Sequence, residues 1–118
     1  MPRNMAPPMK PKLSALVITY NEMGYIERCL ESVAFADEIL VVDSYSTDGT
    51  YEYLLNHTKV TVLQHPFENF TAQKSYALSQ STNDWTLFLD ADEVVTPDLK
   101  EEILSTIQSP DPCEAYWF

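Results

Sequence analysis

The most regular feature of the sequence is a succession of short, mainly apolar runs, each followed by polar residues. Apolar runs of about 4 to 8 residues that are bounded by turn signals are typical of strands covered on both faces. Four strands are predicted on this basis, at residues 13–18, 38–43, 60–64 and within the stretch 85–93. The last of these strands brings acidic side chains to its own carboxyl end.

Apolar residues at helical spacing lie between the predicted strands. A first helix is expected to begin near Asn21, which is a good N-cap residue. Its buried stripe is predicted to consist of Ile26, Cys29, Leu30 and Val33. A short second helix follows the chain reversal at Asp48-Gly49. Its inward-facing residues are predicted to be Tyr51, Leu54 and Leu55.

Two more helices are predicted in the second half of the chain. The third is expected to run from Ala72 to about Ser81, with Thr71 as its cap and with Tyr76, Ala77 and Gln80 on one side. The fourth is expected to begin at Pro97, because Thr96 suits the N-cap position and proline suits the first helical position. The buried stripe of this helix is predicted to be Leu99, Ile103, Leu104 and Ile107.

Strict alternation of strands and helices predicts an α/β fold with three layers, in which a mainly parallel sheet has helices on both faces. The 118 residues are enough for one domain, which we assign to residues 13–118. Residues 1–12 contain four prolines and no apolar run, so we expect a flexible lead-in. Residues 115–118 resemble the start of a fifth strand. We therefore expect a fragment of a longer protein, whose truncated sheet edge can pair with another copy.

The composition excludes several classes of protein. A net charge of −11 argues against nucleic-acid binding and against broad electrostatic attachment to anionic lipid. No apolar run approaches the roughly 20 residues of a membrane-spanning helix. The two cysteines, Cys29 and Cys113, lack metal-site spacing, and a reduced thiol is expected at Cys29. We expect a cytoplasmic protein, with peripheral attachment to the inner face of a membrane as the alternative.

Candidate chemistry gathers at the carboxyl ends of three predicted strands. Asp90 and Asp92 form an Asp-X-Asp (DXD) motif, in which two carboxylates lie two residues apart. Like charges this close repel each other, and a divalent cation with oxygen ligands relieves the repulsion. On its own the motif is better explained as a polar turn at the end of a strand, because such short motifs often occur without a metal. Thr19 to Glu22 and Asp43-Ser44 follow two other strands. Ligands of parallel sheets bind outside the carboxyl ends of strands, so these groups are expected to lie together.

Four segments together resemble the N-terminal, donor-binding half of family 2 glycosyltransferases, which have the fold called GT-A. Their order and spacing agree with that family from about residue 13 to the end of the chain. The segments are Ala15 to Glu22, Glu38 to Thr50, Gln73 to Leu78 and Leu87 to Glu93. The sequences Ala72-Gln73-Lys74 and Asp90 to Glu93 are most similar to the corresponding motifs of the subgroup that adds sugars to the lipopolysaccharide core.

The resemblance implies that the chain binds a nucleotide-diphosphate sugar, of the uridine diphosphate (UDP) class, together with Mn²⁺ or Mg²⁺. The implied donor-binding residues are Thr19, Tyr20, Glu22, Asp43, Lys74 and Asp90. Asp92, with Asp90, is implied to bind the metal ion, which stabilises the leaving nucleoside diphosphate as a Lewis acid. Two departures concern these contacts. Ser44-Tyr45 stands where many members have a second acid and glycine, and Gln73-Lys74 stands where many have alanine and arginine.

The resemblance also implies an inverting transfer to a glycan or lipid-linked acceptor, such as lipopolysaccharide core. The carboxylate general base of such a reaction is expected beyond Phe118, because no feature of the sequence identifies Glu93 as that base. Alternatives are a non-catalytic module with the same fold, a haloacid-dehalogenase-type phosphatase and a receiver-type signalling domain. The phosphatase places its acidic pair after the first strand and the receiver needs a late lysine, so both fit poorly.

Overall fold

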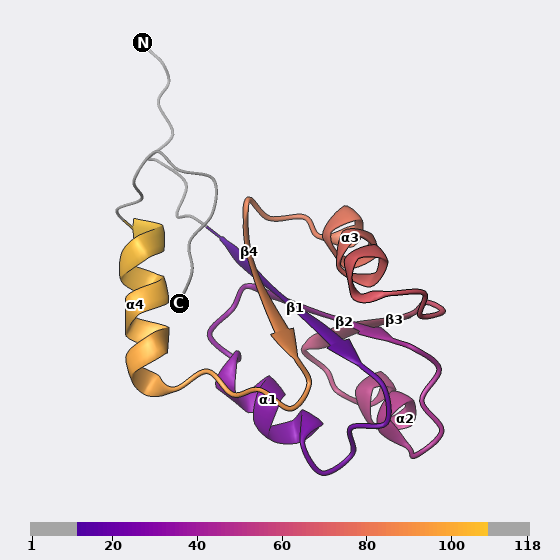
Figure 1. The fold of residues 1–118 in the computed structure, drawn as a ribbon. Helices are drawn as coiled ribbons and strands as arrows, with labels where there is room; N and C mark the ends of the chain where they lie inside the picture. Colours follow the sequence, from indigo (N-terminus) through magenta and orange to yellow (C-terminus); the bar gives the residue numbers. More distant parts are fainter. Residues whose placement is uncertain (1–11, 109–118) are drawn as a thin grey trace.

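The computed structural model describes residues 12–108, which form a sheet of four parallel strands flanked by helices (Figure 1). The strands are β1 (Leu13–Thr19), β2 (Glu38–Asp43), β3 (Val60–Gln64) and β4 (Trp85–Asp90). Their order across the sheet is β3-β2-β1-β4, and all three pairings are parallel. The four strands predicted from the apolar runs are therefore confirmed, with β1 extending one residue further.

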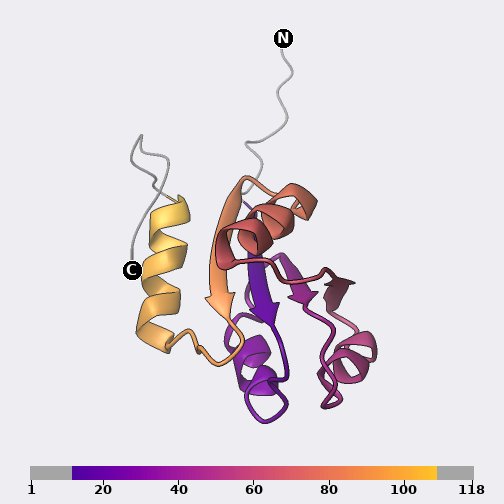
Figure 2. The same cartoon turned by 45° about the vertical axis from the view of Figure 1, so that its right-hand side comes forward.

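Helices cover both faces of this sheet, as Figure 2 shows from a second direction. They are α1 (Ile26–Ser32), α2 (Thr50–Leu55), α3 (Phe70–Gln80) and α4 (Pro97–Gln108). Buried residues of α1, α2 and α4 form one core with Ala15 and Val17 of β1. Ala77 of α3 packs on the opposite face with Leu16. The predicted three-layer α/β/α class is correct.

Strand β1 is buried at every position, because successive side chains point into the two different cores. Strand β4 forms an edge of the sheet within residues 12–108, and its side chains from Trp85 to Phe88 are only half-buried. The prediction of a fourth strand covered on both faces is correct in part: Leu89 is buried, Leu87 packs against one core and Phe88 against the other.

The first helix begins at Ile26, five residues after the predicted start near Asn21. Asn21 has a backbone φ of 51°, in the left-handed region that asparagine tolerates better than most residues. Its side-chain Oδ1 accepts a hydrogen bond from the Thr47 backbone N–H at 2.7 Å. Asn21 therefore joins two loops instead of capping a helix. The predicted apolar stripe is nevertheless buried, at Ile26, Cys29, Leu30 and Val33.

The second helix buries fewer residues than expected. Gly49 precedes it with a φ of 99°, and Thr50 and Leu54 are its buried side chains. These two residues are four apart and share one face of the helix, whereas Leu55 lies about 100° further round. Leu55 is 57% exposed, so the prediction that it faces inward is wrong.

The third helix begins at Phe70, with Asn69 and not Thr71 as its cap: Asn69 Oδ1 accepts the Ala72 N–H at 2.8 Å. Its buried residues are Gln73 and Ala77, while Gln80 is exposed and Tyr76 is half-buried.

The predicted cap of the fourth helix is confirmed, since Thr96 Oγ1 accepts the Leu99 N–H at 3.2 Å. Its stripe is fully buried only at Ile103 and Ile107.

Three expectations lie outside the described residues. They concern the lead-in, Cys113, and the strand start at residues 115–118 with its proposed pairing to another copy. Within residues 12–108, no helix has both the length and the apolar character needed to cross a bilayer.

The contrast between neighbouring leucines of α2 gives a test of the fold. We expect Leu54→Ala to lower the free energy of unfolding by about 2 to 5 kcal/mol, because it leaves a cavity in the core. Leu55→Ala should change it by less than about 0.5 kcal/mol, as at other exposed positions. Urea denaturation followed by circular dichroism measures both. Equal losses in the two variants would contradict the observed face of α2.

Candidate functional site

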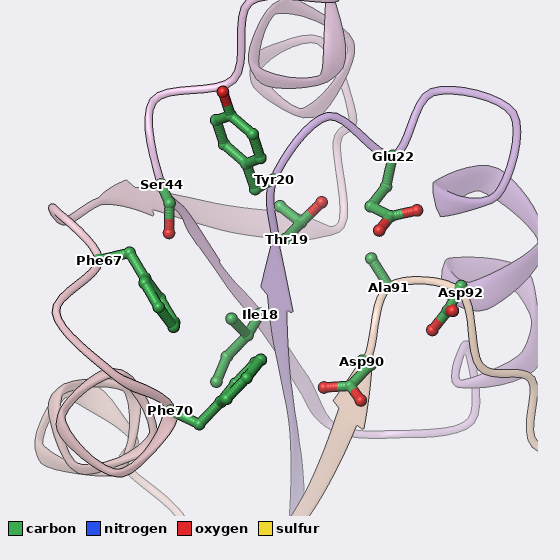
Figure 3. Close-up of a pocket in the computed structure, with 10 residues that line it drawn as sticks. All are labelled: Ile18, Thr19, Tyr20, Glu22, Ser44, Phe67, Phe70, Asp90, Ala91 and Asp92. Atoms are coloured by element: carbon green, nitrogen blue, oxygen red, sulfur yellow. The ribbon is translucent and has the colours of Figure 1, made fainter.

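A cleft of about 520 Å³ opens at the carboxyl ends of the strands (Figure 3). This volume lies within the range of small-molecule sites, and the position is where parallel sheets bind their ligands. The residues that line it come from the ends of β1 and β4 and the turns that follow them, from the chain after β2, and from the β3–α3 connection with the first residue of α3. They are Ile18, Thr19, Tyr20, Glu22, Ser44, Phe67, Phe70, Asp90, Ala91 and Asp92.

Three carboxylates converge on one side of the cleft. Asp90 ends β4, Asp92 lies in the turn that follows, and Glu22 follows β1 (Figure 3). Burial, and then the charges of Asp92, Asp48 and Asp90, raise the pKa of Glu22. This side of the cleft is therefore short of positive charge.

The pKa of Asp90 is raised in the same way, first by burial and then by Glu93, with a smaller contribution from Asp92. Lys74 opposes this rise. A bound cation would favour the charged forms of these acids.

The acidic side fits a metal ion that takes part of its coordination from a ligand. Within residues 12–108, no three acidic, histidine or cysteine side chains are grouped closely enough to hold an ion by themselves. Asp90 and Asp92 supply two carboxylates. Magnesium-type ions commonly use one or two carboxylates, with water and phosphate oxygens completing the shell.

The turn from Asp90 to Glu93, here called the acidic turn, is held by hydrogen bonds within it and by one from α1. Glu93 Oε1 accepts the Asp90 N–H at 2.8 Å, and the Glu93 N–H donates to Asp90 O at 2.9 Å. From α1, the Cys29 thiol donates to Asp90 O at 3.7 Å. Burial, and then Glu93, Asp92 and Asp90, raise the pKa of Cys29 to about 12, so the thiol keeps its proton. Glu93 therefore has a structural role in this turn.

Ser32 extends this support further along the chain. Its Oγ accepts the Val95 N–H at 2.9 Å and donates to Cys29 O at 2.7 Å. The helical pattern assigns Ser32 to the outer face of the first helix, and only the packing of residues 93–95 against α1 identifies its role.

Hydrogen bonds join the loop after β1 to the segment between Ser46 and Thr50 that follows β2. The Asn21 N–H donates to Ser46 Oγ at 2.8 Å, and the Met23 N–H donates to Asp48 Oδ2 at 3.2 Å. The Glu22 N–H donates to Thr50 Oγ1 at 3.1 Å. These bonds fix the backbone that carries Tyr20 and Glu22 into the cleft.

Asp43 lies beneath these loops and is not among the residues that line the cleft. Its side chain is fully buried, and its carboxylate accepts the Ser46 N–H at 2.9 Å and the Ser46 hydroxyl. Gln64 Nε2 donates to it at 3.3 Å. Its predicted contact with a nucleotide stays a prediction, and a direct contact requires some of these bonds to be exchanged.

The remaining predicted residues occupy different positions. Tyr20 lines the cleft and is 55% exposed, whereas Thr19 is 2% exposed and its hydroxyl has no hydrogen-bond partner among residues 12–108. Lys74 lies on the exposed side of α3, with Nζ 5.9 Å from the centre of the Phe88 ring, and is not a lining residue. Its effect on the pKa of Asp90 nevertheless links it to the acidic side.

Sequence reasoning missed the other side of the cleft. Phe67 and Phe70 line it from the segment between β3 and the first turn of α3, which the pattern predicts only as a loop. The sequence signal that could have identified this side was the presence of two aromatic residues flanking the Glu68-Asn69 pair in a predicted loop. Ser44 also lines the cleft, beside the buried Asp43 to which the nucleotide contact was assigned.

Comparisons with known proteins agree with the family resemblance of the sequence. A family model described as "Glycosyl transferase family 2" matches residues 14–115. An uncharacterized glycosyltransferase of Rickettsia bellii is 43% identical over 93 residues, which cover 78% of this chain and 31% of the relative. The lipopolysaccharide core biosynthesis glycosyltransferase LpsC of Rhizobium meliloti is 35% identical over 109 residues, which cover 87% of this chain and 40% of the relative. The chain therefore spans well under half the length of these relatives.

A solved structure gives the same result for the fold. The crystal structure of S. aureus TarS 1-349 matches with a TM-score of 0.67 and 30% identity. The match covers 82% of this chain and 32% of that one.

The raised pKa values predict that the acidic site opposes folding of the ligand-free protein. When folding raises the pKa of an acid, the protein loses stability as the pH rises above the pKa of that acid in the unfolded state. The loss is complete once the pH exceeds the pKa of the acid in the folded state. Glu22→Gln should therefore raise the free energy of unfolding at pH 7, by about 0.5 kcal/mol for so accessible a group. The gain should vanish near pH 3, where the acid is protonated in both states.

This effect can be measured by urea denaturation at both pH values. The substitution leaves the backbone hydrogen bonds of Glu22 intact. Glu101→Gln, on the exposed side of α4, is the matched control and should change little. A loss of stability at pH 7 in Glu22→Gln would show that the surrounding charges and burial do not destabilise the ionised form of Glu22.

The Ser32 contact predicts a second effect on stability. Ser32→Ala leaves the Val95 N–H without its acceptor, which should lower the free energy of unfolding by about 1 to 3 kcal/mol. Amide hydrogen exchange at Val95 should also become faster. Ser79→Ala removes an exposed hydroxyl that donates to Tyr76 O at 2.6 Å, and should cost less than about 0.5 kcal/mol. Unchanged exchange at Val95 would refute the supporting role of Ser32.

Proposed function

The chain belongs to glycosyl transferase family 2, and we propose that its cleft binds a nucleoside-diphosphate sugar together with a divalent metal ion. One observation carries the proposal. Glu22, Asp90 and Asp92 reach the same cleft from adjacent strand ends, and the pKa values of Glu22 and Asp90 are raised. Such a surplus of negative charge suits a metal–diphosphate ligand and repels a free anion.

In this proposal Asp90 and Asp92 hold Mn²⁺ or Mg²⁺ on the acidic side of the cleft. When bound, the ion supplies Lewis-acid stabilisation of the leaving diphosphate. Lys74 adds a compact positive charge near Asp90, which suits a phosphate oxygen. The chain's own carboxylates thus position the ion, and the interlocked loops keep Glu22 in place beside it.

The nucleoside is proposed to contact the residues at the end of β1. Tyr20 offers exposed ring surface, and Thr19 lies in the wall of the cleft. Asp43 acts on the nucleoside through the loop that it anchors, or directly after exchanging a hydrogen bond with Ser46. We propose a UDP-sugar as the donor, because this is the donor class implied by the family motifs.

The complete reaction is proposed to be an inverting transfer of the sugar to a glycan acceptor. LpsC is named for lipopolysaccharide core biosynthesis, and we propose an acceptor of that class for this protein. Deprotonation of the acceptor hydroxyl requires a general base. That base remains predicted beyond Phe118, and a cytoplasmic location likewise remains a prediction.

Calorimetric titration with UDP, in the presence and absence of Mn²⁺, tests donor binding. We expect binding that depends on Mn²⁺ and that falls at least about tenfold in Asp92→Asn, since even indirect supports of a metal ion contribute about that much. Asp84→Asn, at the opposite end of β4, is the matched control and should bind as the wild type does. Failure of the wild-type chain to bind any nucleoside diphosphate would favour a non-catalytic module.

A further inference from the structure

Glu93 shapes the acidic turn although it does not line the cleft. Asp90 and Asp92, the two proposed metal ligands, are lining residues, and Glu93 is not. Glu93 nevertheless contacts Asp90 directly, because its Oε1 accepts the Asp90 N–H at 2.8 Å. The contact is made to the main chain of Asp90, at the residue where β4 ends. Glu93 can therefore influence the site through Asp90 without touching a ligand itself.

Glu93 holds the main chain of Asp90 at two points. Its side chain accepts the Asp90 N–H, and its own N–H donates to Asp90 O at 2.9 Å. A third bond reaches the same carbonyl from α1, where the Cys29 thiol donates to it at 3.7 Å. Both polar groups of the Asp90 main chain are thus occupied. The backbone at Asp90 cannot rotate without breaking at least one of these bonds.

Ala91 sets the direction in which the two neighbouring carboxylates point. It is 2% exposed and belongs to the core that contains Cys29 and Val95, whereas Asp90 and Asp92 are exposed. With Ala91 packed inward, the acids on either side of it are directed toward the cleft, as Figure 3 shows. Ala91 fixes the middle of the turn, and the bonds from Glu93 fix the end that carries Asp90.

The bond from the Glu93 side chain is of a strong kind. A carboxylate that accepts a backbone N–H forms a charge-assisted hydrogen bond, which is stronger than a bond between neutral groups. One oxygen of Glu93 is committed to this bond. Within residues 12–108, no three acidic, histidine or cysteine side chains are close enough to hold an ion together. A supporting role therefore fits Glu93 better than direct coordination of a metal.

We propose that Glu93 is a positioning residue for the metal site, which holds the Asp90 main chain so that the carboxylates of Asp90 and Asp92 bind one divalent ion together. The metal affinity then depends on the reach of the Glu93 side chain and not on its charge. Residues that orient metal ligands commonly contribute about 10- to 100-fold to metal affinity. This inference rests on the proposed function, because it assumes that Asp90 and Asp92 bind the ion.

Two substitutions separate the reach of Glu93 from its charge. Glu93→Gln keeps an acceptor oxygen at the same distance along the side chain and removes the charge. Glu93→Asp keeps the charge and shortens the side chain by one carbon, which takes the oxygen away from the Asp90 N–H. Glu101→Gln and Glu101→Asp, on the exposed side of α4, are the matched controls.

Electron paramagnetic resonance of aqueous Mn²⁺, recorded with UDP present and against a blank without protein, measures the metal affinity. We expect Glu93→Asp to weaken Mn²⁺ binding by roughly tenfold or more. Glu93→Gln should stay within about threefold of the wild type, since a neutral bond replaces a charge-assisted one in the same geometry. Glu93→Ala should lose as much as Glu93→Asp, and replaces it if that variant does not fold.

Hydrogen exchange at the Asp90 amide, measured in the metal-free protein, reports the Glu93 bond by itself. Exchange should become faster in Glu93→Asp and stay near the wild-type rate in Glu93→Gln. The Glu101 variants should change neither this rate nor the Mn²⁺ affinity. Agreement between exchange and metal affinity across the variants would tie the affinity to this one hydrogen bond.

The outcomes separate this inference from the proposed function. Wild-type Mn²⁺ affinity in Glu93→Asp would overturn the inference. A loss in Glu93→Gln as large as that in Glu93→Asp would also overturn it, because the charge of Glu93 would then be what the ion requires. In both cases the donor site stands, since the wild-type chain still binds UDP with Mn²⁺. Absence of Mn²⁺-dependent UDP binding in the wild type would overturn both.

Discussion

Strand β1 pairs in parallel with both of its neighbours, and the position of the cleft follows from this pairing. β1 is the central partner of β2 and β4, and the registers set Thr19 opposite Asp43 and Ile18 opposite Asp90. Parallel strands present their carboxyl ends at one edge, so three separate polar segments meet there. Burial of β1 on both faces holds this register, since a slip of one residue would exchange the two cores.

The edge so formed is electrostatically unfavourable without a ligand. Burial and mutual repulsion raise the pKa values of Glu22 and Asp90, while Lys74 lowers that of Asp90 only in part. Neutral donors support the acidic turn, including the Cys29 thiol and backbone amides. The close grouping of these negative charges therefore lowers the free energy of unfolding, and burial of the apolar core has to offset this loss. A metal-dependent ligand explains this arrangement, because its cation offsets the repulsion.

Side chains of the loops do as much to shape the cleft as the strands do. Asn21 and Asp48 tie the loop after β1 to the loop after β2, and buried Asp43 ties the second loop to its own strand. Gln73 connects α3 to Ser44. The two walls of the cleft are thus set by different networks.

Much of the fold was predictable because strand and helix periodicities depend on local sequence. The four strands, the parallel sheet and the stripe of the first helix follow from apolar spacing. The start of that helix was wrong because Asn21 found partners 26 residues away, and short-range capping rules do not include them. Leu55 was assigned inward because hydrophobicity alone does not choose between two neighbours on one turn.

The order of the motifs along the chain is enough to identify the class of site: acids and hydroxyls at the ends of successive strands, in an order that matches one enzyme family. Which of these side chains face the cleft follows only from the folded structure. Folding brings Glu22, Asp90 and Asp92 together, places Ser44 at the cleft and Asp43 beneath the loops, and adds Phe67 and Phe70. The physical reason is that a side chain's direction at a strand end depends on long-range hydrogen bonds. Those bonds form only after the sheet has joined segments far apart in the chain.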